Sequence, residues 1–325
     1  MIIKAREKPI YITKLEALND RLAANHEKKQ MINQHLINRL TGYKGEQSLD
    51  YFLSFLEEPD YHIFHGIRLF DGTNYFQIDT LLISRKLIII SEIKRMAGIL
   101  KFEPEFNQFT RITEENVMEP YADPILQAER QKFQLNKWLR RNSKLSNLPI
   151  ESLVISTSNK AVLQTTQGNK TVPEKVIHKE FFPFKIKKLE KQYLENVISS
   201  SEHTILSHLI LQNHSPHNPD ILKNYDLSQI DLLTGVHCPE CRYLPMKRRK
   251  GRWTCPRCSA VSKNAHLKAL KDYALLIDTK ITNAQACKFL RIESSSVTKR
   301  LLGAASSRYE GDKKSRTYFL TGLIE

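Results

Sequence analysis

The chain has 325 residues, of which 41% are hydrophobic and 9% are aromatic. This composition excludes a disordered chain, and the length exceeds that of one ordinary domain, so we expect two or three folded domains. The formal net charge is +15, which favours a polyanionic partner, either nucleic acid or an anionic membrane surface. No apolar run approaches the length that crosses a bilayer.

The N-terminus and the cysteines indicate the compartment. The first residues lack the apolar core of a secretory signal. Four of the five cysteines lie in Cys-x-x-Cys pairs, which indicates bound metal in a reducing compartment rather than disulfides. We therefore predict a cytoplasmic protein that binds nucleic acid and does not enter a membrane.

Two helices are predicted before the first strand. A loose stripe of leucines predicts a helix from residue 11 to about residue 40 that ends at Thr41-Gly42. Its role is packing or self-association, and it is a weak hint of a homodimer. A second helix is predicted at residues 44–56, opened by Gly45-Glu46. Glu46 lies at the edge of the buried face, where the simpler interpretation is a favourable interaction of an acid with the helix N-terminus.

A β pattern follows these helices. Strands are predicted at residues 61–70, 75–84 and 87–94, because β-branched and aromatic residues are frequent there. Asp71-Gly72 is a strong hairpin signal between the first two strands. The second and third strands are expected to form a hairpin with a tight turn at Arg85-Lys86.

That turn fixes a register with a chemical consequence. It places Asp79 directly opposite Glu92, with Lys94 on the same face of the sheet. Opposed like charges destabilise a sheet, and a divalent cation such as Mg²⁺, which one or two carboxylates hold together with substrate phosphates, would compensate them. A lysine beside such a metal can orient a water or stabilise charge on a phosphate. The alternative is a sheet edge that ends in solvated charges.

The next segment leads to a crossover helix. Residues 95–122 are predicted to be irregular and to form a flap beside the site. A helix is predicted at residues 124–141, with Asp123 as its N-cap and Gln127 in its first turn. Gln127 either points toward the open end of the sheet or is a solvated surface glutamine. The following predicted elements are strands at residues 151–158 and 176–182 and a helical segment at residues 188–211.

This order of elements predicts the fold class α/β. A helix between the third and fourth strands permits a right-handed crossover and parallel pairing. We therefore expect a mixed sheet flanked by helices in a domain of about 200 residues. Sites in open α/β sheets gather at strand ends, where Asp79 and Glu92 are placed.

Four short motifs carry a family resemblance. They are Gly45-Glu46, Gln77-Ile78-Asp79, Ser91-Glu92-Ile93-Lys94 and Asp123-Pro124-x-x-Gln127. In order and spacing they resemble the nuclease-related domain (NERD) family, which is similar to the wider PD-(D/E)xK, or restriction-endonuclease-like, superfamily. One departure is Arg95, where such domains often carry a small polar residue.

The resemblance implies a restriction-endonuclease-like sheet and phosphodiester hydrolysis in DNA. It implies that Asp79 and Glu92 hold a divalent metal, Mg²⁺ or Mn²⁺, and that Lys94 assists the attacking water. It further implies that Glu46 completes the acidic cluster and that Gln127 is an accessory polar group of the active site. A fold can persist without its chemistry, so an inactive nuclease fold is an open alternative.

The strongest single motif follows a predicted linker at residues 212–232. Cys238-Pro-Glu-Cys241 and Cys255-Pro-Arg-Cys258 are two knuckles with thirteen residues between them. Four thiolates on paired tight turns suit tetrahedral Zn²⁺ and leave no position open for water, so a structural zinc is expected. A disulfide pair or a redox motif is the less favoured alternative. The intervening residues are expected to fold back as the hairpin of a zinc ribbon.

The segment between the knuckles is the first candidate DNA-binding surface. Its basic residues suit phosphate contact and its tryptophan suits stacking on a base. The alternative is a solvated basic turn. The candidate residues are Lys247, Arg248, Arg249, Lys250, Arg252 and Trp253.

The last part of the chain is predicted to contain a helix-turn-helix. Thr282 and Gln285 form a capping box, and a turn at residues 291–293 leads to a second helix at residues 294–302. This second helix suits a DNA groove, and residues 313–320 would be a following wing strand. The alternative is a helical hairpin that binds protein. The predicted exposed face carries Ser295, Ser296, Thr298, Lys299 and Arg300.

These patterns together predict a metal-dependent DNA nuclease that a zinc ribbon and a helix-turn-helix bring to DNA. A catalytically inactive DNA-binding or regulatory protein is the first alternative, and a protein-interaction scaffold is the second. The predicted segments are an N-terminal helix (1–41), a nuclease-like α/β domain (42–211), a linker (212–232), a zinc ribbon (233–262) and a helix-turn-helix domain (263–325).

Overall fold

The computed structural model describes the whole chain except residues 57–60, 144, 146, 307, 313–314 and 325. The described residues divide into two compact units. Unit 1 comprises Met1–Lys8 and Asn38–His217, and unit 2 comprises Pro9–Ile37 and Asn218–Glu325. Residues 1–41, predicted as one N-terminal segment, are thus divided between the units, and the boundaries of the five predicted segments stay predictions.

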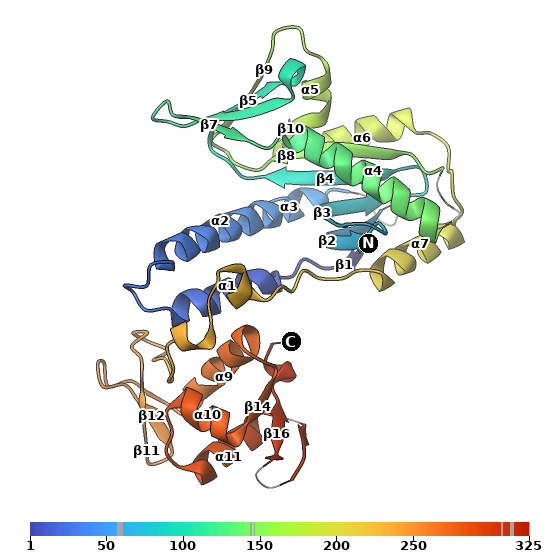
Figure 1. The fold of residues 1–325 in the computed structure, drawn as a ribbon. Coiled ribbons are helices and arrows are strands. Elements are labelled where there is room, and N and C mark those ends of the chain that lie inside the picture. The colour runs from blue at the N-terminus through green and yellow to red at the C-terminus, as the bar shows by residue number, and fades with distance from the viewer. Residues whose placement is uncertain (57–60, 144, 146, 307, 313–314, 325) are drawn as a thin grey trace. The chain divides into compact units, whose positions relative to one another are not determined.

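Unit 1 is built on a six-stranded sheet with the order β1-β2-β3-β4-β8-β10 (Figure 1). β2, β3 and β4 pair antiparallel, whereas β8 runs parallel to β4 after the crossover helix α4. The predicted mixed sheet and its parallel pairing are therefore confirmed. These elements are β1 (Ile2–Lys4), β2 (His62–Phe70), β3 (Tyr75–Ile83), β4 (Ile88–Lys94), α4 (Pro124–Asn142), β8 (Ile150–Ser156) and β10 (Val176–His178).

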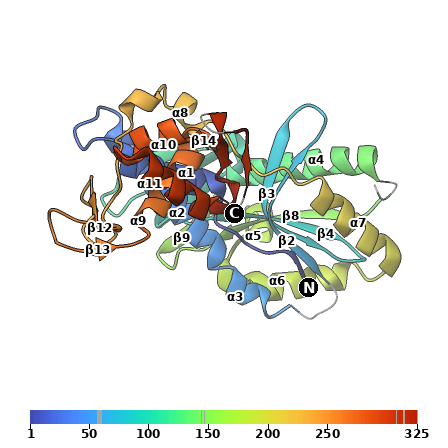
Figure 2. The same cartoon turned by 90° about the horizontal axis from the view of Figure 1, so that it is seen from below.

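Helices cover both faces of this sheet, and Figure 2 shows α4 and α6 on opposite sides of it. On one face Trp138 of α4 and Leu206 of α7 pack on apolar residues of β2, β3 and β4. On the other face Leu53 of α3 and Ile186 of α6 pack on β3, β4 and β8. Burial on both faces explains why the central strands are nearly continuous apolar runs. The further helices are α3 (Asp50–Leu53), α6 (Phe182–Gln192) and α7 (Ser200–Gln212).

The prediction of an irregular segment at residues 95–122 is wrong. The structure has a second, four-stranded sheet there, with the order β7-β6-β5-β9. Phe102 and Phe109 form a pair across β5 and β6, and both side chains are buried. The strands are too short to give a clear alternation of polar and apolar residues. They are β5 (Gly98–Glu103), β6 (Gln108–Ile112), β7 (Met118–Tyr121) and β9 (Ala161–Thr165), and α5 (Thr171–Lys175) follows them.

The first helices also differ from their prediction, because the structure has α1 (Ile10–Arg21) and α2 (Lys29–Gln47) where one helix was expected. α2 continues through Gly42, so Gly45 and Glu46 lie in its last turn instead of opening a new helix. A β-carbon on Gly45 would meet Cβ of Arg95 at 2.7 Å and Oγ1 of Thr157 at 3.0 Å. The helix tolerates this glycine because it permits a close approach to the sheet, which brings Glu46 to the sheet edge.

Unit 2 joins small sheets and helices around one apolar core. One sheet has the order β11-β12-β13. Trp253 of β12, Leu270 of α9 and Leu290 of α10 all belong to this core. The predicted linker contains helix α8, whose Ile221 and Leu222 are buried, so that segment is partly folded. The elements of unit 2 besides α1 are α8 (Ile221–Asn224), β11 (Lys247–Arg249), β12 (Arg252–Thr254), β13 (Val261–Ser262), α9 (Ala265–Leu276), β14 (Lys280–Thr282), α10 (Asn283–Leu290), α11 (Ser295–Ala305), β15 (Tyr309–Glu310) and β16 (Thr317–Phe319).

A second sheet of unit 2 has the order β14-β16-β15. β16 falls within the predicted wing strand, of which residues 313 and 314 lie outside the described residues. Across the part of the chain that the structure describes, no helix has the length and apolarity needed to cross a bilayer.

Candidate functional site

The hairpin of β3 and β4 has the predicted register. Its ladder runs from the turn at Arg85-Lys86 to the pair Thr80 and Ser91. Asp79 and Glu92 occupy the next position beyond that pair. The Asp79 carboxylate is anchored there, since its Oδ2 accepts a hydrogen bond of 2.9 Å from the backbone N–H of Ile93. The tight turn therefore brings both predicted acids to one end of the hairpin.

Glu92 is only 2% exposed, and side chains from two elements hold its carboxylate. Lys94 Nζ lies 2.8 Å from Glu92 Oε1, and Gln131 Nε2 donates to Glu92 Oε2 at 2.7 Å. Lys94 also donates to Oε1 of Gln127 at 3.0 Å. Gln127 and Gln131 lie one turn apart on α4, so this helix fixes the end of β4.

Glu46 reaches this region from α2, where an arginine holds it. The Arg6 side chain is 6% exposed, and its Nη1 lies 2.8 Å from Glu46 Oε2. Arg6 Nε donates to Asp50 Oδ1 at 3.0 Å. Arg6 Nη2 donates to His65 Nδ1 at 2.7 Å and to Thr80 Oγ1 at 3.2 Å. One guanidinium thus joins α2, α3 and the sheet.

Burial and the charges of neighbouring side chains shift the pKa values in this cluster. Burial, together with the charges of Glu92 and Glu46, raises the pKa of Asp79 well above its ordinary value. Burial also raises the pKa of Glu46, although Arg6 opposes the shift. For His65, burial and nearby cations lower the pKa to about 3, so the ring is neutral and accepts from Arg6.

This donor set fits a hard divalent cation. Carboxylate oxygens are the ligands that Mg²⁺ prefers, and a cation would relieve the repulsion that raises the pKa of Asp79. The carboxylates are not gathered into a closed cage. Among the described residues, the only group of three or more His, Cys, Asp or Glu placed to hold a metal is the cysteine cluster of unit 2.

A comparison with protein families identifies the domain that contains these residues. Residues 41–157 match the family model described as the nuclease-related domain, or NERD. This segment is a nuclease-related domain. Its restriction-endonuclease-like fold agrees with the mixed sheet of unit 1, so the family resemblance is confirmed. Comparisons with curated proteins and with solved structures each found no match.

Two residues that support the NERD carboxylates were not predicted from sequence. Arg6 follows the three-residue strand β1, lies outside the matched segment, and is separated by 40 residues from its partner Glu46. No local pattern marks such a residue. Gln131 had a signal, because it lies four residues after Gln127 and therefore on the same face of α4.

Outside the NERD domain, the four predicted zinc ligands converge in unit 2. Sγ of Cys238 lies 3.6 Å from that of Cys258, and Sγ of Cys241 lies 3.5 Å from that of Cys255. All four sulfur atoms lie within 4.8 Å of one another. Zn–S bonds of about 2.3 Å separate the sulfur atoms of a tetrahedron by about 3.8 Å, so this geometry fits a structural zinc.

Both knuckles use the same backbone turn. The residue after each knuckle is left-handed, with φ of 62° at Arg242 and 61° at Ser259. Burial opposes ionisation of the Cys255 thiol, but backbone N–H groups of Cys258 and Arg257 lower its pKa to about 7. A thiolate is the form that binds zinc, so the folded turn favours the metal-binding state.

The basic residues of the ribbon lie on a tight hairpin. Lys250 and Gly251 form its two-residue turn, with φ of 44° and 78°. The prediction that Trp253 stacks on a base is wrong, because its side chain is 1% exposed and its Nε1 donates to His266 Nδ1 at 3.3 Å. A tryptophan stabilises a small module most by filling its core. The exposed ribbon residues are Lys247, Arg249, Lys250 and Arg252, and Arg248 is half-buried.

The predicted capping box of Thr282 and Gln285 is present at the start of α10. The prediction that Thr298 is exposed is wrong, since it is 0% exposed and its Oγ1 donates to the carbonyl of Ser294 at 3.2 Å. Thr298 lies one turn before buried Leu302, so it belongs to the core face of α11. The exposed predicted residues of α11 are Ser295, Ser296, Lys299 and Arg300.

Proposed function

We propose that the chain is a metal-dependent DNA nuclease that hydrolyses phosphodiester bonds. The observation that carries this proposal is the convergence of Asp79, Glu92 and Lys94 at one end of the β3–β4 hairpin within a NERD domain. The net charge of +15 supports DNA as the substrate. The zinc ribbon and the predicted helix-turn-helix of α10 and α11 would bring the chain to DNA. A cytoplasmic location and a homodimer remain predictions.

Each polar residue of the site has a distinct role in this proposal. Asp79 and Glu92 would hold Mg²⁺ or Mn²⁺, which would supply a polarised phosphate and a more acidic water. Lys94 places its ammonium beside Glu92, where it can hold the attacking water and offset charge on the phosphate. Gln127 orients Lys94 by accepting its hydrogen bond, and Gln131 fixes the Glu92 carboxylate.

A second candidate is a catalytically inactive DNA-binding protein with the same fold. One observation favours it, because protein cations already contact two carboxylates of the cluster. Lys94 is 2.8 Å from Glu92, and Arg6 is 2.8 Å from Glu46. Such internal ion pairs satisfy the acids without a metal and would compete with its binding.

Cleavage of supercoiled plasmid in Mg²⁺ or Mn²⁺ separates the two candidates. We expect the wild type to cut, and Asp79→Asn and Glu92→Gln to lose at least about 100-fold in rate, since each removes a metal ligand that stabilises transition-state charge. Relaxed or linear product would show whether one strand or both are cut. Glu114→Gln is the matched control, because Glu114 is an exposed acid of the same domain and should leave cutting unchanged.

All variants should be compared at equal zinc content, at a temperature where thermal melting shows each of them to be folded. A folded, zinc-loaded wild type that binds DNA tightly without cutting it would contradict the nuclease proposal. That result would support the inactive DNA-binding protein.

A further inference from the structure

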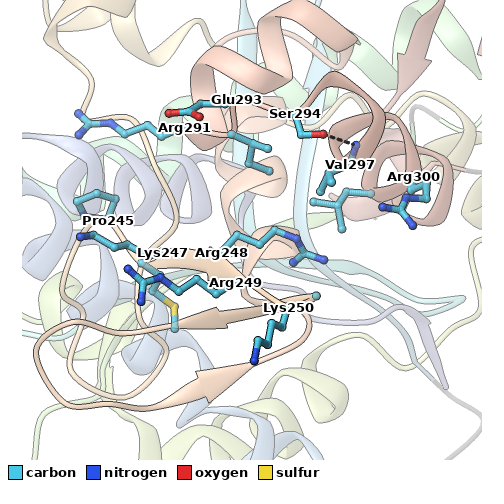
Figure 3. Close-up of a pocket in the computed structure, with 14 residues that line it drawn as sticks. Pro245, Lys247, Arg248, Arg249, Lys250, Arg291, Glu293, Ser294, Val297 and Arg300 are labelled. Carbon is cyan, nitrogen blue, oxygen red and sulfur yellow. Dashed lines mark hydrogen bonds between the residues drawn. The ribbon is translucent and has the colours of Figure 1, made fainter.

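Unit 2 contains a groove of about 870 Å³ between the zinc-ribbon hairpin and the turn and helix that follow α10 (Figure 3). We call it the cationic groove, because six of its lining residues are basic and one is acidic. β11 and its turn form one wall, and residues 291–301 form the other. The charged lining residues are Lys247, Arg248, Arg249, Lys250, Arg291, Glu293 and Arg300.

Two arginines from opposite walls approach one another within the groove. Arg248 comes from β11 and Arg300 from α11, and Figure 3 shows their guanidinium groups directed into the same part of the groove. Burial, followed by the charge of Arg300, lowers the pKa of Arg248. No ion pair joins Glu293 to either arginine among the described residues. The two like charges therefore lack a compensating protein group.

Arg248 also has an unsatisfied donor in this position. Its Nη1 is buried and has no hydrogen-bond partner among the residues that the structure describes. A buried donor without a partner costs about 1–3 kcal/mol, and more when the group is charged. An anion bound in the groove would offset the positive charges of Arg248 and Arg300, and a small movement of the Arg248 side chain would give this donor an acceptor.

The position of Arg248 is fixed by the core beneath it. Its Cζ lies 5.2 Å from the centroid of the Trp253 ring, a distance typical of a cation–π contact. Trp253 is buried and is held in turn by His266. The tryptophan expected to stack on a base instead supports the arginine that faces the groove.

We propose that a phosphate of the DNA backbone binds between Arg248 and Arg300, with the strand following the cationic groove. Arginine suits this role because its planar fork donates paired hydrogen bonds to phosphate oxygens. Arg291 is not among the predicted DNA-binding residues, but it belongs to the same surface and donates a 2.8 Å hydrogen bond to Thr234 Oγ1. This inference rests on the proposed action on DNA and specifies where the backbone is held.

The test measures binding of a fluorescent DNA duplex of about 30 base pairs over a series of salt concentrations. The full-length, zinc-loaded chain carries Asp79→Asn so that the probe is not cut. We expect Arg248→Gln and Arg300→Gln each to weaken binding at least about tenfold and to reduce the slope of log K against log salt by about 0.9. The loss of affinity in the double variant should be smaller than the product of the losses in the two single variants, because both arginines contact one phosphate.

Lys263→Gln is the matched control, because it removes the same charge from an exposed residue beside the ribbon that does not line the groove. Equal affinity and equal salt slope for Arg248→Gln, Arg300→Gln and this control would overturn the inference, as would no binding of DNA by the parent chain. If the Arg248→Gln chain does not retain zinc, the binding measured for Arg300→Gln decides whether the phosphate site exists. Arg300 is an exposed helix residue, so its replacement should not disturb the zinc ribbon.

Plasmid cleavage by chains with intact Asp79 separates this inference from the proposed function. Groove-dependent binding with no cleavage by the wild type would contradict the nuclease proposal and leave the phosphate site standing. Cleavage that requires Asp79, together with normal binding by both arginine variants, would refute the phosphate site alone.

Discussion

The cysteine cluster of unit 2 and the carboxylate cluster of unit 1 solve the same electrostatic problem in different ways. Both bring ligand groups together that repel one another when ionised. The four cysteine sulfurs lie within 4.8 Å of one another, and when they are thiolates a bound metal supplies the compensating charge. Two of the carboxylates are instead paired with protein cations, with Lys94 on Glu92 and Arg6 on Glu46.

This difference indicates what each site needs in order to fold. A closed set of thiolates depends on its metal, because the small ribbon has little apolar core of its own. The carboxylates rest on a large sheet whose two faces are both covered by helices. Their internal ion pairs provide contacts that keep the site assembled without a divalent ion. Removing either kind of support should therefore have effects of different size.

We expect Cys255→Ser to cause the largest loss of folding stability. Structural zinc binding contributes about 10–16 kcal/mol in small zinc modules, so loss of one ligand should release the zinc and unfold the ribbon. Zinc content and the thermal melting of the full chain report both events. Cys287→Ser is the matched control, since Cys287 is a half-buried thiol outside the cluster. A Cys255→Ser chain that keeps one zinc and its native melting curve would contradict a four-cysteine structural site.

We expect a smaller loss of folding stability from Arg6→Met. This substitution keeps an aliphatic side chain and removes the guanidinium. Glu46 and Asp50 would be left without their shared cation, and loss of one partner of a buried ion pair costs about 3–5 kcal/mol. Because Asp50 is partly exposed, we expect about 2–4 kcal/mol in urea unfolding of the domain. The control Lys160→Met removes a 76% exposed cation and should change stability by less than about 1 kcal/mol. Equal stabilities for the two variants would show that Arg6 does not hold the site together.

The contrast between the sites also explains what could be predicted from sequence. The cysteine knuckles, the capping box at Thr282 and the register set by Arg85-Lys86 depend on residues close together in the chain. Such features follow from spacing and turn chemistry, so their sequence signals were sufficient. The family motifs placed Asp79, Glu92 and Lys94 for the same reason, since one hairpin carries all three.

The remaining parts depend on contacts between distant segments. Arg6 acts from a short edge strand on residues 40 and more positions away, and no local pattern encodes that contact. The basic or polar neighbours of Trp253 and Thr298 in the sequence predict that both side chains are exposed. Their burial is decided by the core that the ribbon and α11 form, which periodicity over a few residues does not reveal.

The smallest expected effect has the opposite sign, and it tests whether the carboxylates repel one another. Without divalent ions, Asp79→Asn should stabilise the domain by up to about 1 kcal/mol at neutral pH, because it removes one of the facing like charges. The asparagine oxygen can still accept the hydrogen bond from the Ile93 N–H. Glu114→Gln, which removes an exposed acid, is the control.

The pH dependence of the stabilisation by Asp79→Asn tests whether charge repulsion causes it. Burial and the nearby acids raise the pKa of Asp79 in the folded state, so the folded chain binds more protons than the unfolded chain once the pH exceeds about 4. The wild type therefore loses stability as the pH rises through this window, and the advantage of Asp79→Asn should grow over the same range. Urea unfolding between acid and neutral pH measures it. If Asp79→Asn instead destabilised the metal-free domain at neutral pH, the carboxylate would be a structural anchor and the repulsion argument for a metal site would fail.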